Sequence, residues 1–238
     1  MRATRIVAIA GLSTALLGTA QADIESSASV GYSTEYIYRG ANLGEDLVDF
    51  SLDFSGSTDL ADWSLGLWYG SWEGGVDEMQ VEASLSKCVS DALTLKAGLL
   101  NHSNQNAVVI DGIAAFLDDR TEAVVGLSTN LGGVELSAAA HFNASSEYAH
   151  DVYYELGAEF TQDLGASLTG SLGATVGVWD TDPLGTGADD VTFVAITGAL
   201  DYAASDSITL SAHITHSISD DWIFEDETFG GASVSVKF

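Results

Sequence analysis

Residues 134–142, VELSAAAHF, carry an apolar side chain at every second position, with Glu135 and His141 among the residues between. Successive side chains of a β-strand point to opposite faces, so this alternation predicts a strand with one apolar and one polar face. The same alternation is clear in six further segments, 48–55, 93–99, 152–160, 168–178, 208–215 and 233–238. Weaker alternation near residues 26–38, 63–72, 76–87, 121–130 and 191–203 brings the prediction to about twelve strands.

The N-terminal segment is typical of a secretory signal. Arg2 and Arg5 precede an uncharged apolar run over residues 6–17, and Ala20 and Ala22 follow as small residues around a cleavage site. The alternative is an N-terminal helix of the mature fold, which the absence of helical periodicity in later segments disfavours. We therefore expect a cleaved signal peptide over residues 1–22 and one domain over residues 23–238.

Composition excludes several classes of protein. A net charge of −28 repels nucleic acid, so we expect no nucleic-acid partner. The 46% hydrophobic content argues against disorder, and the single Cys88 excludes an internal disulfide. After the signal, no run of about eighteen apolar residues could form a transmembrane helix. Transmembrane β-strands need only about ten alternating residues each, so a membrane barrel is compatible with this composition.

Alternation alone fits both a water-soluble β-sandwich and a membrane barrel, and loop length separates them. Short connections are predicted at 59–62, 89–91, 131–133, 163–165 and 203–206. Longer polar connections are predicted at 40–46, 103–120, 145–150, 180–190 and 219–227, and only the short one at 74–75 breaks the pattern. Short periplasmic turns and long external loops are typical of outer-membrane barrels. The apolar segment 108–116 within one long loop is expected to pack against the barrel or fold into its mouth.

Aromatic residues and the C-terminus also favour a barrel. Girdles of aromatic side chains mark the two membrane interfaces of such barrels, whereas aromatics of a sandwich core would lie in the middle of strands. The residues near predicted strand ends are Tyr32, Tyr36, Tyr38, Trp63, Tyr69, Trp72, Trp179, Tyr202, Trp222 and Phe224. The last strand ends on Phe238, which resembles the signal read by the barrel-assembly machinery. We expect an all-β, transmembrane, antiparallel up-and-down barrel in the outer membrane, with the last strand paired to the first and lipid around its outer face.

The segment 31–43, GYSTEYIYRGANL, resembles the opening of the TorF-type porins. These are small exported barrels whose mature N-terminus carries a tyrosine-rich strand that ends in an aromatic residue, Arg and Gly. The resemblance implies an outer-membrane barrel, and a porin function less directly. This chain departs from that family in being unusually acidic.

The polar faces of the predicted strands are rich in carboxylates. The residues expected to line the lumen are Glu35, Asp49, Asp53, Glu82, Lys96, Glu122, Glu135, Glu155, Glu159 and Lys237. Such a lining favours cations over anions, as rings of Asp and Glu do in cation channels. The alternative is a satisfied polar network without a role in selectivity.

Hairpin counting predicts Lys96 directly or diagonally across from Glu82, and Glu135 facing Glu159. Closure of the barrel should bring Lys237 near Glu25. Arg39 is placed at the pore mouth, either as a positive charge facing the solute or as the partner of a nearby acid.

No enzyme or cofactor motif emerges. The histidines His102, His141, His150, His213 and His216 accompany no Gly-x-Ser-x-Gly nucleophile motif, and the glycines show no Walker or Rossmann spacing. We therefore expect no catalytic residues, metal or cofactor. The first functional hypothesis is a porin or narrow channel for small solutes that favours cations. The second is a non-conducting barrel with a structural or surface-interaction role.

Overall fold

The computed structural model describes residues 24–73, 76–105, 119–145, 152–179, 191–219 and 226–238. These residues form twelve antiparallel strands. The bounds are β1 (Glu25–Tyr38), β2 (Ala41–Ser57), β3 (Asp62–Trp72), β4 (Val76–Ser90), β5 (Leu93–Gln105), β6 (Arg120–Leu131), β7 (Val134–Asn143), β8 (Val152–Gly165), β9 (Leu168–Trp179), β10 (Val191–Ala203), β11 (Ile208–Ser219) and β12 (Glu227–Lys237). None of the described residues belongs to a helix long and apolar enough to cross a membrane.

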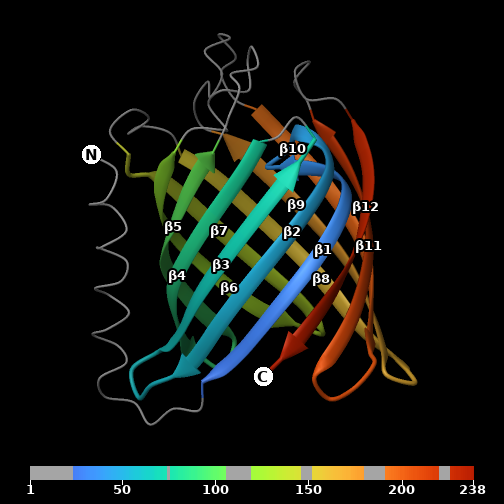
Figure 1. Ribbon diagram of the computed structural model, residues 1–238. Helices are drawn as coiled ribbons and strands as arrows, with labels where there is room; N and C mark the ends of the chain where they lie inside the picture. The colour runs from blue at the N-terminus through green and yellow to red at the C-terminus, as the bar shows by residue number, and fades with distance from the viewer. Residues whose placement is uncertain (1–23, 74–75, 106–118, 146–151, 180–190, 220–225) are drawn as a thin grey trace.

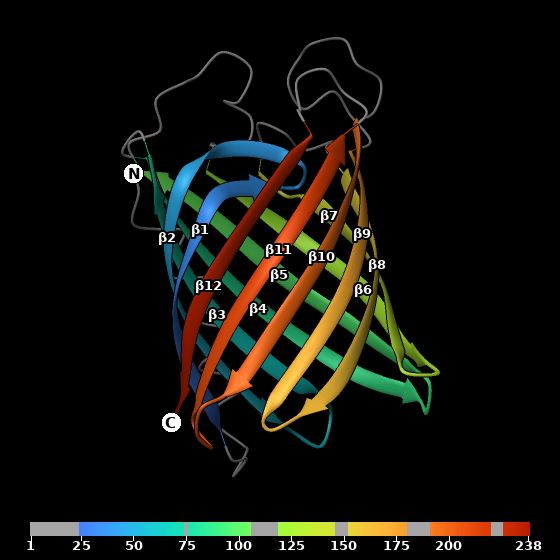
Figure 2. The same cartoon turned by 90° about the vertical axis from the view of Figure 1, so that its right-hand side faces the viewer.

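The strands close into a barrel in which each pairs with its sequence neighbours and β1 pairs with β12 (Figures 1 and 2). Ser27 lies opposite Lys237 at this seam, so the described chain begins and ends at the same end of the barrel. Apolar side chains such as Val30 and Phe50 are exposed on the outer wall. The predicted closed twelve-strand barrel is therefore confirmed.

The predicted connection lengths hold with one exception. The chain needs long connections between Gln105 and Arg120 and between Trp179 and Val191. The predicted loop over residues 40–46 is wrong, because β2 already begins at Ala41 and the turn consists of Arg39 and Gly40 alone. The polar residues that suggested a loop instead pair with β1. The predicted signal peptide and the apolar segment 108–116 lie outside the described residues.

The upper part of the β1–β2 hairpin leaves the barrel wall. Pairing between β1 and β12 stops at Ser33, and pairing between β2 and β3 begins only at Val48. Between these points the two strands form a ladder only with each other, and one backbone hydrogen bond, from the Glu73 N–H to the Glu45 carbonyl at 2.8 Å, reaches the wall. In both views the blue ribbons of β1 and β2 turn across the upper end of the barrel (Figures 1 and 2). We call residues 34–47 the hairpin tip.

Closure of the barrel depends on a close backbone approach at Gly231. A Cβ atom there would lie 2.5 Å from the carbonyl oxygen of Tyr32 and 2.6 Å from Cε1 of His213. Gly231→Ala should therefore destabilise the barrel by about 1–3 kcal/mol, because overpacking forces a backbone shift at the seam. Gly198→Ala is the control, since a Cβ at Gly198 meets no atom within 4 Å. Heat-modifiability on gels measures both, and equal midpoint temperatures for the two variants would contradict the prediction.

Candidate functional site

The hairpin tip lies inside the barrel mouth, with contacts on both of its faces. Glu35 and Tyr36 are neighbours on a strand and point to opposite faces. The Tyr36 hydroxyl donates to Glu78 of β4 at 3.0 Å. On the other face, the amide of Asn42 donates to Glu35 at 3.2 Å and to Glu227 of β12 at 3.1 Å. Because both faces of the tip contact other strands of the barrel, the tip occupies the interior.

The turn at the end of the tip has an unusual composition. Arg39 has φ 51° and Gly40 has φ 86°, as both central residues of a type I′ hairpin turn require. Glycine suits Gly40, where a Cβ would lie 2.8 Å from the Phe193 side chain on β10. Arginine is an uncommon residue at a left-handed position. The contacts of the Arg39 side chain are therefore the feature to explain.

An apolar cluster surrounds the tip. Its buried members are Tyr36, Ala41, Leu43, Leu47, Trp72, Tyr153, Trp179 and Phe193, and Tyr38 and Trp68 pack against them. The prediction that Tyr36, Trp72 and Trp179 belong to interfacial girdles is therefore wrong, because the tip draws them into the interior. Tyr32, Tyr69 and Tyr202 are exposed as a girdle requires. Trp222 and Phe224 lie outside the described residues.

Arg39 joins the tip to the far wall through a bidentate ion pair. Its Nη1 and Nη2 donate to the two carboxylate oxygens of Glu122 on β6 at 2.9 and 2.6 Å. Both side chains are buried, with exposed fractions of 7% and 3%. The guanidinium also lies 4.2 Å from the ring centroid of Tyr153 and 5.1 Å from that of Trp179. Charge-assisted, bidentate and stacked contacts of this kind are the strong ones.

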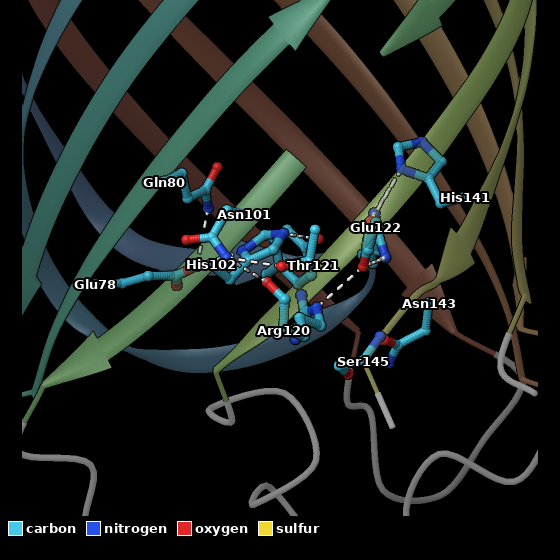
Figure 3. A network of polar contacts seen from close by, with 12 residues as sticks. Glu78, Gln80, Asn101, His102, Arg120, Thr121, Glu122, His141, Asn143 and Ser145 are labelled. Atoms are coloured by element: carbon cyan, nitrogen blue, oxygen red, sulfur yellow. Dashed lines mark hydrogen bonds and ion pairs between the residues drawn. The ribbon is translucent and has the colours of Figure 1, made fainter. Parts of the chain in front are cut away.

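Two further bases share the Glu122 carboxylate. Arg120 Nε donates to Oε1 at 3.0 Å, and His141 Nδ1 lies 3.1 Å from Oε2 (Figure 3). His141 Nδ1 is also 2.9 Å from Arg39 Nη2. That nitrogen can accept from Arg39 or donate to Glu122, but it cannot do both at once. In either state Glu122 keeps both arginines, so this buried carboxylate is the centre of the network.

A second buried network lies beside the first. His102 and Glu78 are 0% and 2% exposed, and His102 Nδ1 lies 2.7 Å from Glu78 Oε1 (Figure 3). An ionised carboxylate only accepts, so Nδ1 carries the proton and donates. His102 Nε2 then faces the Tyr38 hydroxyl at 3.4 Å, and Gln80 donates to Glu78 at 3.0 Å. The tip is therefore joined to β4 and β5 as well as to β6.

Two cavities remain open in the barrel beneath the tip. The larger, about 590 Å³, is lined by residues of β1–β5, β11 and β12, including the carboxylates of Glu35, Asp49, Asp53 and Glu82. The smaller, about 230 Å³, lies toward the chain termini and is lined by Glu25, Lys96 and Lys237 among others. Asp53, Gly66 and Glu82 line both, so the two cavities adjoin.

The structure brings together most of the residues proposed for the lumen. Lys96 and Glu82 are paired at 2.7 Å, although the predicted direct or diagonal register is wrong because Lys96 lies opposite Ser86. Glu135 faces Glu159 in the register of β7 and β8, as predicted. Lys237 and Glu25 line the same cavity. Glu155 accepts from the Tyr153 hydroxyl at 2.8 Å.

Two of the proposed site residues, Glu122 and Arg39, are buried in an ion pair and do not face an open lumen. Glu122 is buried under the tip, and Arg39 is an ion-pair partner of Glu122, as one of the two alternatives predicted. Phe238 is exposed at the chain end, where its backbone N–H donates to the Ser26 carbonyl at 3.0 Å.

Sequence reasoning missed Glu78, His102, Tyr153 and Phe193. Each belongs to a strand that was recognised, but nothing in its local pattern marks it as a contact of the tip. Among the described residues, no group of three or more His, Cys, Asp or Glu side chains could hold a metal ion. The arrangement offers cavity volume lined by carboxylates.

Solved structures share this architecture. The COG4313 outer membrane channel from Pseudomonas putida F1 matches with a TM-score of 0.60 at 13% identity, over 90% of this chain and 95% of that one. The NanC porin matches at 0.57 and 14%, over 90% and 100%. The KdgM porin in complex with disordered oligogalacturonate matches at 0.57 and 9%, over 89% and 99%. The chain has the fold of small outer-membrane porins. No protein-family model and no curated protein matches it, so membership of the TorF-type family is not shown.

The two carboxylates of β4 that pair with bases on β5 should differ in their importance for stability. Glu78→Ala leaves His102 and the Tyr36 hydroxyl buried without their acceptor, which should destabilise the barrel by about 1–3 kcal/mol. Glu82→Ala removes an ion pair whose side chains are 39% and 45% exposed, and should change stability by less than about 1 kcal/mol. Urea unfolding in detergent or lipid measures both. A larger loss for Glu82→Ala would show that the buried network does not hold the tip.

Proposed function

We propose that this protein is a narrow outer-membrane channel for small solutes that favours cations. In this proposal the segment 1–22 is a cleaved signal peptide, and lipid surrounds the apolar outer wall. The barrel-assembly machinery inserts the chain and reads the terminal strand that ends on Phe238. We propose that this chain has no catalytic activity, because its site offers carboxylates and cavities but no nucleophile motif.

One observation carries the proposal: the barrel keeps two adjoining cavities although the hairpin tip fills part of its mouth. The larger cavity carries four carboxylates and no Lys or Arg in its lining. Carboxylates around a narrow passage lower the energy of a cation and raise that of an anion. We propose that Asp49 and Asp53 contribute most to this preference, because they face the larger cavity without a basic partner among the described ion pairs.

We do not propose oligogalacturonate, the ligand in the KdgM complex, as a solute of this chain. Oligogalacturonate is a polyanion, and it would meet Glu35, Asp49, Asp53 and Glu82 in the larger cavity. The repulsion between like charges in a confined, weakly screened space opposes its entry. Small cations and small neutral solutes fit the proposed passage better.

A specific observation favours the second candidate, a non-conducting barrel with a structural or surface-interaction role. The tip crosses the mouth and is held there by two buried networks. A barrel of about twelve strands stands between the small side-chain-filled barrels and the wide porins, so either state is compatible with its size. Steady current through the purified protein separates the two candidates.

Neutralising the cavity carboxylates should reduce the preference for cations. In a planar bilayer under a salt gradient, the refolded protein is expected to give a cation-selective reversal potential. Asp49→Asn with Asp53→Asn should move that potential toward zero, because two negative charges leave the wall of the passage.

Asp59→Asn is the matched control, since Asp59 lies in the turn between β2 and β3 and lines neither cavity. It should leave the reversal potential unchanged. A folded barrel that passes no current would overturn the channel and favour the second candidate. A current without cation preference would overturn the role of the carboxylates alone.

A further inference from the structure

We infer that Arg39 determines the size limit of the channel by anchoring the hairpin tip across the barrel mouth. The inference rests on the proposed channel function, and it names a specificity-determining residue within that channel. Arg39 acts at the mouth, away from the carboxylates that we propose to select cations.

The position of the tip depends on side chains. Beyond Ser33 and before Val48, the regular ladders with β12 and β3 have ended. Two hydrogen bonds still join the base of the tip to the wall, from the Glu73 N–H to the Glu45 carbonyl at 2.8 Å and from the Gly230 N–H to the Thr34 hydroxyl at 3.2 Å, and the end of the tip is held by side chains. Leu43 forms a bulge opposite Tyr36 and Ile37, and Asp46 has φ 56°, so the backbone bends where it leaves the wall. A bent hairpin whose ladders with the barrel wall have ended needs side-chain contacts at its turn to fix its position.

Arg39 supplies these contacts at the turn of the hairpin, the end of the tip farthest from where β1 and β2 leave the wall. Its side chain contacts four consecutive strands: Glu122 on β6, His141 on β7, Tyr153 on β8 and Trp179 on β9. Arg39 itself occupies a left-handed backbone position that arginine rarely adopts. Uncommon backbone conformations persist where surrounding contacts determine them, and they cluster at functional positions.

Among the described residues, the larger cavity lies on one side of the anchored tip. The larger cavity is bounded by the tip itself, through Glu35, Tyr36 and Tyr38, and by strands that include β2, β3 and β12. The strands that contact Arg39, β6 to β9, do not line it. Release of Arg39 would let the tip move away from β6–β9 and widen the route through the mouth.

The size limit can be measured by the largest poly(ethylene glycol) that enters the pore and lowers its conductance. Arg39→Ala and Glu122→Ala remove opposite charges from one contact. If the contact anchors a plug, both variants should raise the single-channel conductance and admit larger polymers, and the double variant should add little to either. Lys87→Ala is the matched control, because it removes a cation that lies on β4, outside the tip, and lines neither cavity. It should leave the polymer limit unchanged.

Opposite shifts of the reversal potential for Arg39→Ala and Glu122→Ala, with an unchanged polymer limit, would overturn the inference and assign the pair a purely electrostatic role. Heat-modifiability verifies folding, and Arg39→Gln and Glu122→Gln replace the alanine variants if these do not refold. A silent wild type with a conducting Arg39→Ala would support the plug and overturn native conduction. Silence of both would overturn the plug as well as the channel.

Discussion

The ion pair between Arg39 and Glu122 connects two parts of the barrel that backbone pairing leaves apart. Removing two charges from water is unfavourable unless geometry and further hydrogen bonds compensate. Here the contact is bidentate, a second arginine shares the carboxylate, and aromatic rings cover the guanidinium. The apolar cluster surrounds the tip that this contact holds, and the larger cavity lies beside the same tip.

When a hairpin enters a barrel, the side chains on both of its faces need partners inside the barrel. Elsewhere on β1, one face meets the outside and the other the interior, and strict alternation serves that purpose. In the tip, Tyr36 and Leu43 are buried and Glu35 binds Asn42, so neither face is free of partners. Residues 35–47 therefore mix apolar and polar side chains without a clean period, and the segment resembles a loop although it is a strand.

The parts of this fold that the sequence predicts are the parts governed by local periodicity. The strand VELSAAAHF and the closing strand just before Phe238 follow from alternation. Lys96 and Glu82 form an ion pair, but hairpin counting misplaces them: Lys96 lies opposite Ser86, and its long side chain reaches Glu82. The contact of Arg39 with Glu122 does not follow from alternation, because it depends on the angle at which a hairpin leaves the wall. The sequence indicates only that Arg39 lies at the pore mouth and could pair with a nearby acid, without naming Glu122.

The chain has few basic residues, so the position of each arginine affects the distribution of charge in the barrel. The whole chain has seven Lys and Arg residues against thirty-five Asp and Glu. Arg39 and Arg120 both contact the single carboxylate of Glu122, so their charge is concentrated on the β6 side of the mouth. The carboxylates of Asp49 and Asp53 face the larger cavity with no arginine or lysine in its lining. Lys96 compensates Glu82 from the adjoining cavity, whereas Asp49 and Asp53 have no lysine or arginine partner among the described ion pairs. In the proposed channel, the contact that holds the tip and the carboxylates that attract cations therefore lie on different sides of the same mouth.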